Sequence, residues 1–138
     1  MIVENHGGLS SHGRWLADMM EAVAHPRCGT LPDFGNFKDV SRGLRGKKGR
    51  IAGPLDYDPY LGTYELMPYA KGVSAKTFEF DDDGNETTLD YSRIMNIVLD
   101  PRFNFTGHVG VEFEGHGDSL DGIKKTIALL ERVRDQRA

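Results

Sequence analysis

Three carboxylates in this chain stand at the ends of short apolar segments that are typical of β-strands. Glu4 follows "IV", Asp33 follows "CGTLP" and Glu112 follows "GHVGV". In parallel α/β folds, the loops after the carboxyl ends of the strands converge, and residues that carry out chemistry collect there. Carboxylates held together repel one another unless a cation lies between them. The pattern therefore predicts a divalent metal site, and its oxygen-rich ligands suit Mn²⁺, Mg²⁺, Co²⁺ or Zn²⁺.

A second set of polar residues accompanies these carboxylates at the same strand ends. Because alternate residues of a strand share a face, His6 lies on the face of Glu4 and Glu114 lies on the face of Glu112. Asn36 follows the second predicted strand, and Ser74 and Lys76 lie in the third. Taken singly, each is more often a helix cap or an ion-pair partner, so the hypothesis depends on their convergence. The set consists of His6, Asn36, Ser74, Lys76 and Glu114.

The hydrophobic pattern predicts four strands that alternate with four helices. A strand is expected at 2–6, 28–34, 70–78 and 107–115, and a helix at 13–25, 60–68, 91–99 and from 119 onward. Such β-α alternation favours a parallel sheet with right-handed crossovers. In the last helix, helical spacing predicts an inward stripe that consists of Leu120, Ile123, Ile127, Leu130 and Val133.

Composition narrows the possible partners and location. A length of 138 residues suits one domain, and a net charge of −4 argues against a nucleic acid held by phosphate neutralisation. No apolar run approaches the roughly 20 residues that cross a bilayer, so no membrane partner is expected. Without a targeting segment, a cytoplasmic location is favoured. Cys28 is the single cysteine, which excludes an intrachain disulfide and a cysteine-based metal cluster.

Two other segments allow a functional interpretation. The basic run from Arg42 to Arg50 could hold an anionic substrate, although a solvated loop is the more common role of such a run. In "EFDDDGNETTLD", Glu79, Asp81 and Asp83 have the spacing of a calcium loop, but Asp90 replaces the bidentate glutamate. A turn at Asp-Gly is the simpler prediction.

Several of these segments together resemble one family. "ENHGGLSS", "GTLPDFGNF", "LMPYAKGVSAKTFEFDDDGNETTLDY", "GHVGVEFEG" and "GIKKTIALLERV" resemble the xylose isomerase-like TIM-barrel superfamily, and within it the sugar phosphate isomerases/epimerases. That superfamily includes D-tagatose 3-epimerase and the AP-endonuclease-like barrels. The matching segments belong to strands five to eight of the barrel. The resemblance thus implies that residues 1–138 are a single domain, an α/β half barrel of four β-α units from a (βα)8 fold.

The resemblance also implies roles for the residues at the strand ends. In the epimerases, Glu, Asp, His and Glu hold a divalent metal, and Glu4, Asp33 and Glu112 match the first, second and fourth ligands. Ser74 stands in the segment where the family has its histidine. Glu4 and Glu112 would exchange a proton at the carbon next to a carbonyl, while the metal polarises the oxygens.

The remaining residues would contact the substrate, a small carbohydrate. His6, Asn36 and Lys76 would orient its hydroxyls or a developing oxyanion, and Glu114 would assist or replace Glu112. A half barrel would expose two sheet edges and an inner face, which predicts a homo-oligomer that completes the barrel. Two alternatives remain: a non-catalytic truncated barrel or sugar-binding module, and an AP-endonuclease-like phosphodiesterase.

Overall fold

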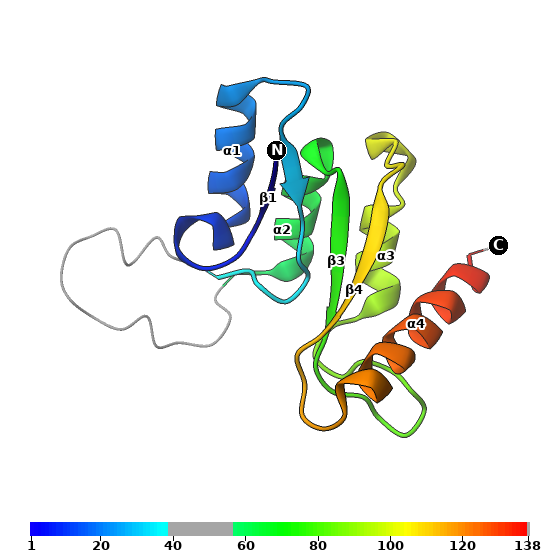
Figure 1. Ribbon diagram of the computed structural model, residues 1–138. Coiled ribbons are helices and arrows are strands. Elements are labelled where there is room, and N and C mark those ends of the chain that lie inside the picture. The colour runs from blue at the N-terminus through cyan, green and yellow to red at the C-terminus, as the bar shows by residue number, and fades with distance from the viewer. Residues whose placement is uncertain (39–56, 138) are drawn as a thin grey trace, which may run out of the picture.

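The computed structural model describes residues 1–38 and 57–137, and the basic run from Arg42 to Arg50 lies outside these ranges. In the described chain, four short strands alternate with four α-helices and three 3-10 turns (Figure 1). The order is β1 (Ile2–Glu4), η1 (Gly8–Ser11), α1 (Gly13–Val23), β2 (Gly29–Leu31), α2 (Pro59–Leu66), η2 (Met67–Tyr69), β3 (Gly72–Thr77), α3 (Tyr91–Val98), η3 (Pro101–Phe103), β4 (His108–Phe113) and α4 (Ser119–Asp135). The alternation predicted from the sequence is confirmed.

Capping side chains set where the four helices begin. Asp58, Asp90 and Asp118 each accept a hydrogen bond from a backbone N–H of the following first turn, at 2.8–2.9 Å. His12 has the same function at α1, where its Nδ1 accepts from the N–H of Trp15 at 3.2 Å. These side chains satisfy backbone donors that the first turn of a helix leaves unpaired.

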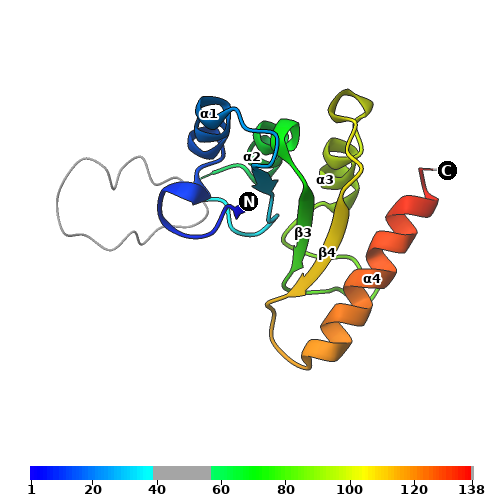
Figure 2. The same cartoon turned by 45° about the horizontal axis from the view of Figure 1, so that its top comes forward.

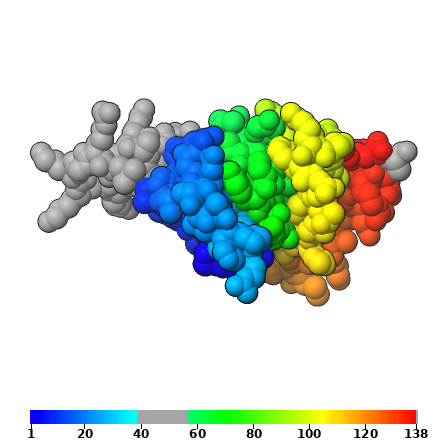
Figure 3. Space-filling view, turned by 90° about the horizontal axis from the view of Figure 1, so that it is seen from above, coloured from blue at the N-terminus to red at the C-terminus, as the bar shows by residue number. Residues whose placement is uncertain are grey.

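The strands pair in parallel, as expected, but they form two sheets. β1 pairs with β2, with Glu4 opposite Leu31. β3 pairs with β4 over six residues, with Lys76 opposite Glu112. Figures 1 and 3 show that the four helices follow one another across the molecule in chain order, from α1 to α4.

The predicted half barrel is wrong, because the structure does not form one continuous four-stranded sheet. In the described chain, only isolated parallel bridges join the two sheets, at Thr30 with Ala70 and at Asp33 with Ser74. Pro32 explains the interruption, because proline has no N–H to donate to the neighbouring strand. Thr30 and Asp33 are three residues apart, whereas their partners Ala70 and Ser74 are four residues apart. The register between the two chain segments therefore shifts by one residue. The fold is a small α/β arrangement with two two-stranded parallel sheets.

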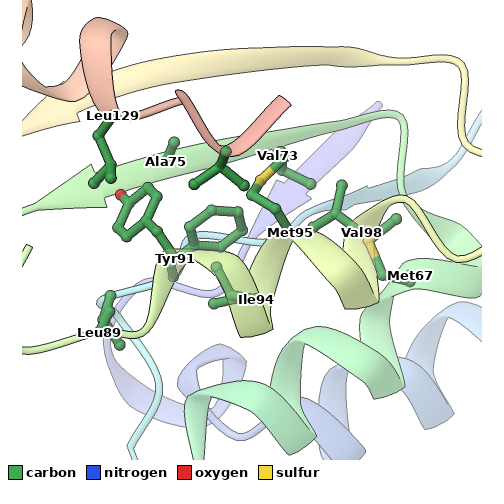
Figure 4. Packing of buried hydrophobic residues seen from close by; sticks show 11 residues of the cluster. Met67, Val73, Ala75, Leu89, Tyr91, Ile94, Met95, Val98 and Leu129 are labelled. Carbon is green, nitrogen blue, oxygen red and sulfur yellow. The ribbon is translucent and has the colours of Figure 1, made fainter. Parts of the chain in front are cut away.

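Two hydrophobic clusters fill the space between strands and helices. In one, Ile94, Met95 and Val98 of α3 pack against Val73 and Ala75 of β3 (Figure 4). The other joins α1 to α2, and its buried members are Leu16, Ala17, Met20, Phe37, Tyr57 and Leu66. Figure 2 shows α1, α2 and α3 in a row behind the strands and α4 beyond β4. The opposite face of β3 is therefore left for polar side chains.

The stripe predicted for α4 is confirmed at one end and wrong at two positions. Val133 is buried and Leu130 packs against the core, whereas Leu120 and Ile127 are 62% and 43% exposed. The other buried residues of the helix are Gly122, Thr126 and Leu129. A Cβ on Gly122 would lie only 2.3 Å from the ring of Phe113, so α4 approaches β4 at a position that only glycine allows. Beside it, the hydroxyls of Thr126 and Thr77 share a hydrogen bond of 2.6 Å, which offsets the cost of burying these polar groups. None of the described helices has the length and hydrophobicity to span a membrane.

Candidate functional site

The polar face of β3 forms one wall of the candidate site. Alternate residues of a strand point to opposite faces of its sheet. Val73 and Ala75 face the core, so Ser74 and Lys76 face the other way. Because Glu112 is directly opposite Lys76 in the parallel register, the two side chains lie together on this face.

The carboxylates of Glu4, Asp33 and Glu112 converge. Each offers an oxygen that lies within 4.8 Å of the oxygens of the other two. Glu4 is the last residue of β1, Asp33 follows β2 after Pro32, and Glu112 lies near the end of β4. The predicted convergence is thus confirmed, and we call these three residues the carboxylate cluster. Their roles as ligands and acid–base groups stay predictions.

Asp33 lies deepest in the carboxylate cluster, with no exposed surface. Its Oδ1 accepts a hydrogen bond from the N–H of Gly35 at 2.9 Å. Its Oδ2 is buried without a hydrogen-bond partner, since the nearest cation, Lys76 Nζ, is 3.5 Å away. That distance is longer than the 2.7–3.2 Å of an ordinary N–H···O bond. One buried carboxylate oxygen therefore has no hydrogen-bond donor, and its charge is balanced only by the longer ion pair with Lys76.

Lys76 brings a positive charge to the carboxylate cluster. Its side chain is only 1% exposed, and its Nζ lies 3.1 Å from Glu112 Oε1 and 3.1 Å from Glu114 Oε2. It also donates to Oδ1 of Asn36 at 3.1 Å. Lysine is almost never buried unless its ammonium is paired, and these contacts provide the pairing.

Two neutral side chains orient the outer carboxylates of the cluster. The Ser74 hydroxyl donates to Glu112 Oε2 at 2.9 Å, and the Asn36 amide donates to Glu4 Oε1 at 3.1 Å. Ser74, predicted as a metal ligand, is therefore placed where it supports Glu112. His6 is exposed, its backbone contacts the hydroxyl of Ser10, and in the described chain it is not a member of the carboxylate cluster.

The environment shifts the pKa values of Asp33 and Glu112 in opposite directions. Burial raises the pKa of Asp33 to about 6, although the Gly35 N–H and Lys76 oppose the shift. Burial also disfavours the charged form of Glu112, but hydrogen bonds from Lys76 and Ser74 outweigh it and lower the pKa of that carboxyl. The half-exposed Glu112 is therefore ionised at neutral pH, whereas ionisation of Asp33 costs free energy in the metal-free protein.

Asn5 is a further residue of the site and does not belong to the set predicted from the sequence. Its side chain is fully buried and makes two hydrogen bonds to the backbone of Asp33. The Asn5 amide donates to the Asp33 carbonyl at 2.9 Å, and the Asp33 N–H donates to Asn5 Oδ1 at 2.6 Å. Asn5 thus replaces the backbone pairing that β2 loses after Pro32. The sequence did contain an indication of this role. Strand alternation places Asn5 on the same side as Val3, toward the core, and a buried amide needs hydrogen-bond partners.

The segment that resembles a calcium loop forms a turn. Oδ1 of Asp81 accepts from the N–H groups of Asp83 and Asn85, and Gly84 has a φ of +74°. Within residues 1–38 and 57–137, the only group of carboxylates placed to share a metal is the one at Glu4, Asp33 and Glu112. The prediction of a turn in place of a calcium site agrees with this geometry.

Asp33→Asn is expected to stabilise the metal-free protein, and to do so more as the pH rises. The raised pKa of Asp33 means that its stabilising protonated form is present below about pH 4 and is lost as the pH passes about 6. Asparagine cannot ionise and avoids this loss, which is on the order of 3 kcal/mol at neutral pH. Urea unfolding of both proteins in chelator at pH 4.5 and 7.5 measures the difference. A gain that is larger at pH 4.5 would contradict this explanation.

Comparison with known proteins gives a partial match to a curated protein. No family model matches the chain. The chain is 29% identical over 79 residues to a C-glycoside deglycosidase alpha subunit from Arthrobacter globiformis, a match that covers 52% of this chain and 22% of that protein. The chain therefore spans about a fifth of the length of the curated relative that it matches. By its name, that relative acts on sugar derivatives, so the chain is similar in part to a sugar-processing enzyme.

Proposed function

We propose that the carboxylate cluster binds a divalent metal ion, and that the chain acts on a small carbohydrate by moving a proton next to a carbonyl group. The observation that carries this proposal is the buried Asp33 Oδ2, which has no hydrogen-bond partner and belongs to three carboxylates within 4.8 Å of one another. Leaving such an oxygen unpaired is costly in a folded protein. A metal ion would remove that cost and the repulsion among the carboxylates.

The residues present fit such an ion. Glu4, Asp33 and Glu112 provide carboxylate oxygens, the ligands that Mg²⁺ and Mn²⁺ prefer, and Co²⁺ or Zn²⁺ also binds such groups. Ser74 and Asn36 already hold Glu112 and Glu4, as hydrogen-bonding neighbours of metal ligands commonly do. When bound, the metal ion would polarise the carbonyl oxygen of the substrate.

Glu112 and Glu4 are the proposed proton-transfer groups. The Glu112 side chain is 43% exposed, so a substrate can reach it, and its lowered pKa keeps it ionised and able to accept a proton. Glu4 comes from the other sheet and would return the proton. Lys76 and Glu114, which lie beside Glu112, would bind the substrate's hydroxyls.

The choice of a carbohydrate substrate has separate support. The partially matching relative is a C-glycoside deglycosidase alpha subunit, and the sequence resembles the sugar phosphate isomerases/epimerases in its strand-end segments. We propose isomerase or epimerase chemistry because two carboxylates beside a metal site suit proton removal and return at one carbon.

Calorimetric titration of the chelator-treated chain with Mn²⁺ tests the metal site. We expect one ion per chain, and Asp33→Asn should weaken binding by about 100-fold or more, since it removes a charged ligand. The matched control is Asp82→Asn, which neutralises an exposed carboxylate in the turn after β3. If the chain binds none of Mn²⁺, Mg²⁺, Co²⁺ and Zn²⁺, the proposal is wrong and a non-catalytic sugar-binding module is favoured.

A further inference from the structure

The ammonium of Lys76 neutralises the same carboxylates that are proposed to bind metal. Its Nζ lies 3.5 Å from Asp33 Oδ2 and 3.1 Å from Glu112 Oε1. We propose that Lys76 is an internal cation that holds the carboxylate cluster together without metal. A divalent ion would displace it, and the released ammonium would bind an anionic oxygen of the substrate. This inference rests on the proposed metal site and adds how that site exchanges one cation for another.

Charge repulsion disfavours the binding of a divalent metal ion while the Lys76 ammonium still contacts the carboxylate cluster. An ion bound by Asp33 and Glu112 would lie near the ammonium that now contacts both, and two positive charges a few ångströms apart in a protein interior repel strongly. The buried Asp33 cannot follow either cation outward, since Asn5 fixes its backbone on both sides. The end of Lys76 is therefore the part that must move.

Lys76 has two further partners that would receive the displaced ammonium. Asn36 Oδ1 and Glu114 Oε2 each lie 3.1 Å from Nζ, and neither residue belongs to the carboxylate cluster. The Glu114 side chain is 60% exposed, so this position lies at the open rim of the site. A small shift of Nζ thus exchanges its contacts with Asp33 and Glu112 for a position that substrate can reach.

The stem of Lys76 is confined, which limits the movement to its end. A Cβ on Gly35 would lie 2.8 Å from Lys76 Cδ and 2.6 Å from Phe78 Cζ, so the stem passes close beside the Gly35 backbone. The hydroxyl of Tyr91 donates to the Lys76 carbonyl at 2.7 Å and holds the backbone of β3 to α3. The movement that we infer is therefore a rotation of the last bonds of the side chain.

The test compares the Mn²⁺ affinity of the wild type with that of Lys76→Met, which keeps the length of the side chain and removes its charge. We expect Lys76→Met to bind Mn²⁺ at least about ten-fold more tightly, because the competing cation is gone. The matched control, Lys71→Met, removes an exposed charge just before β3 and should leave the affinity unchanged.

The outcomes separate this inference from the proposed function. If the wild type binds Mn²⁺ and Lys76→Met binds it equally or more weakly, the internal-cation role is overturned and the metal site stands. If only Lys76→Met binds Mn²⁺, the internal-cation role is supported, and the metal dependence proposed for the native chain fails. If neither binds Mn²⁺, both proposals are overturned.

A second measurement uses the wild type, in case Lys76→Met does not fold. Nuclear magnetic resonance of ¹⁵Nζ-labelled lysine should show one ammonium group whose protons exchange slowly with water when a chelator keeps the protein free of metal. This signal should be absent from Lys76→Arg. Saturation with Mg²⁺ should shift this signal and speed its exchange, since the ammonium moves to the rim. An unchanged signal at saturating Mg²⁺ would overturn the displacement.

Discussion

Glu112→Gln is expected to lower the rate of solvent-deuterium exchange into the substrate by about 1,000-fold, because glutamine cannot accept the proton. The size and the hydrogen bond from Ser74 are retained, so the loss would report the missing carboxylate and not a collapsed site. The measurement is deuterium incorporation from heavy water into a panel of ketohexoses and their phosphates, followed by mass spectrometry at saturating Mn²⁺.

Two further variants make this measurement specific. Glu114→Gln removes a carboxylate from the same strand face that contacts Lys76 but lies outside the carboxylate cluster, so a smaller loss is expected. Glu131→Gln, on the exposed side of α4, should leave the rate unchanged. Exchange that persists at the wild-type rate in Glu112→Gln would remove Glu112 from the acid–base role.

Asn5→Leu is expected to destabilise the protein by about 3 kcal/mol, the largest loss of stability that we predict. Leucine has a similar size but cannot bond to the Asp33 backbone, which would leave a buried N–H and a buried carbonyl unpaired. Chemical denaturation measures the change, with Asn96→Leu on the exposed face of α3 as control, where less than about 0.5 kcal/mol is expected.

The same variant distinguishes a structural role from a supporting role in the site. Because Asn5 fixes the segment that carries Asp33, its loss should also weaken Mn²⁺ binding under conditions where the protein is still folded. A destabilised Asn5→Leu with unchanged Mn²⁺ affinity would show that Asn5 acts on the fold alone.

The convergence of Glu4, Asp33 and Glu112 could be predicted from the sequence because it follows from a general property of parallel strands. Once β-α alternation is recognised, all strand ends lie at one edge, and polar residues at those ends meet. The hydrogen bonds among them could not be predicted in the same way. Ser74 donates to Glu112, and Lys76 is almost fully buried. Both features depend on side-chain geometry, which the spacing of residues in a sequence does not predict.

The failure of the half-barrel prediction has a cause that is visible in the sequence. Pro32 cannot donate a ladder hydrogen bond, and its position one residue before Asp33 places the interruption at the site itself. The stripe predicted for α4 failed at Leu120 and Ile127 for another reason. Hydrophobicity favoured Leu120 and Ile127, whereas close contact with Phe113 required Gly122 to face inward.

The interruption at Pro32 also bears on the order in which the molecule folds. Each sheet belongs to one strand–helix–strand unit, β1–α1–β2 or β3–α3–β4, in which the strand pairing is local in the sequence. The carboxylate cluster draws Glu4 and Asp33 from the first unit and Glu112 from the second. We therefore expect the cluster to form only when the two units pack together. A cation that binds it joins the units and is expected to slow unfolding far more than it speeds folding.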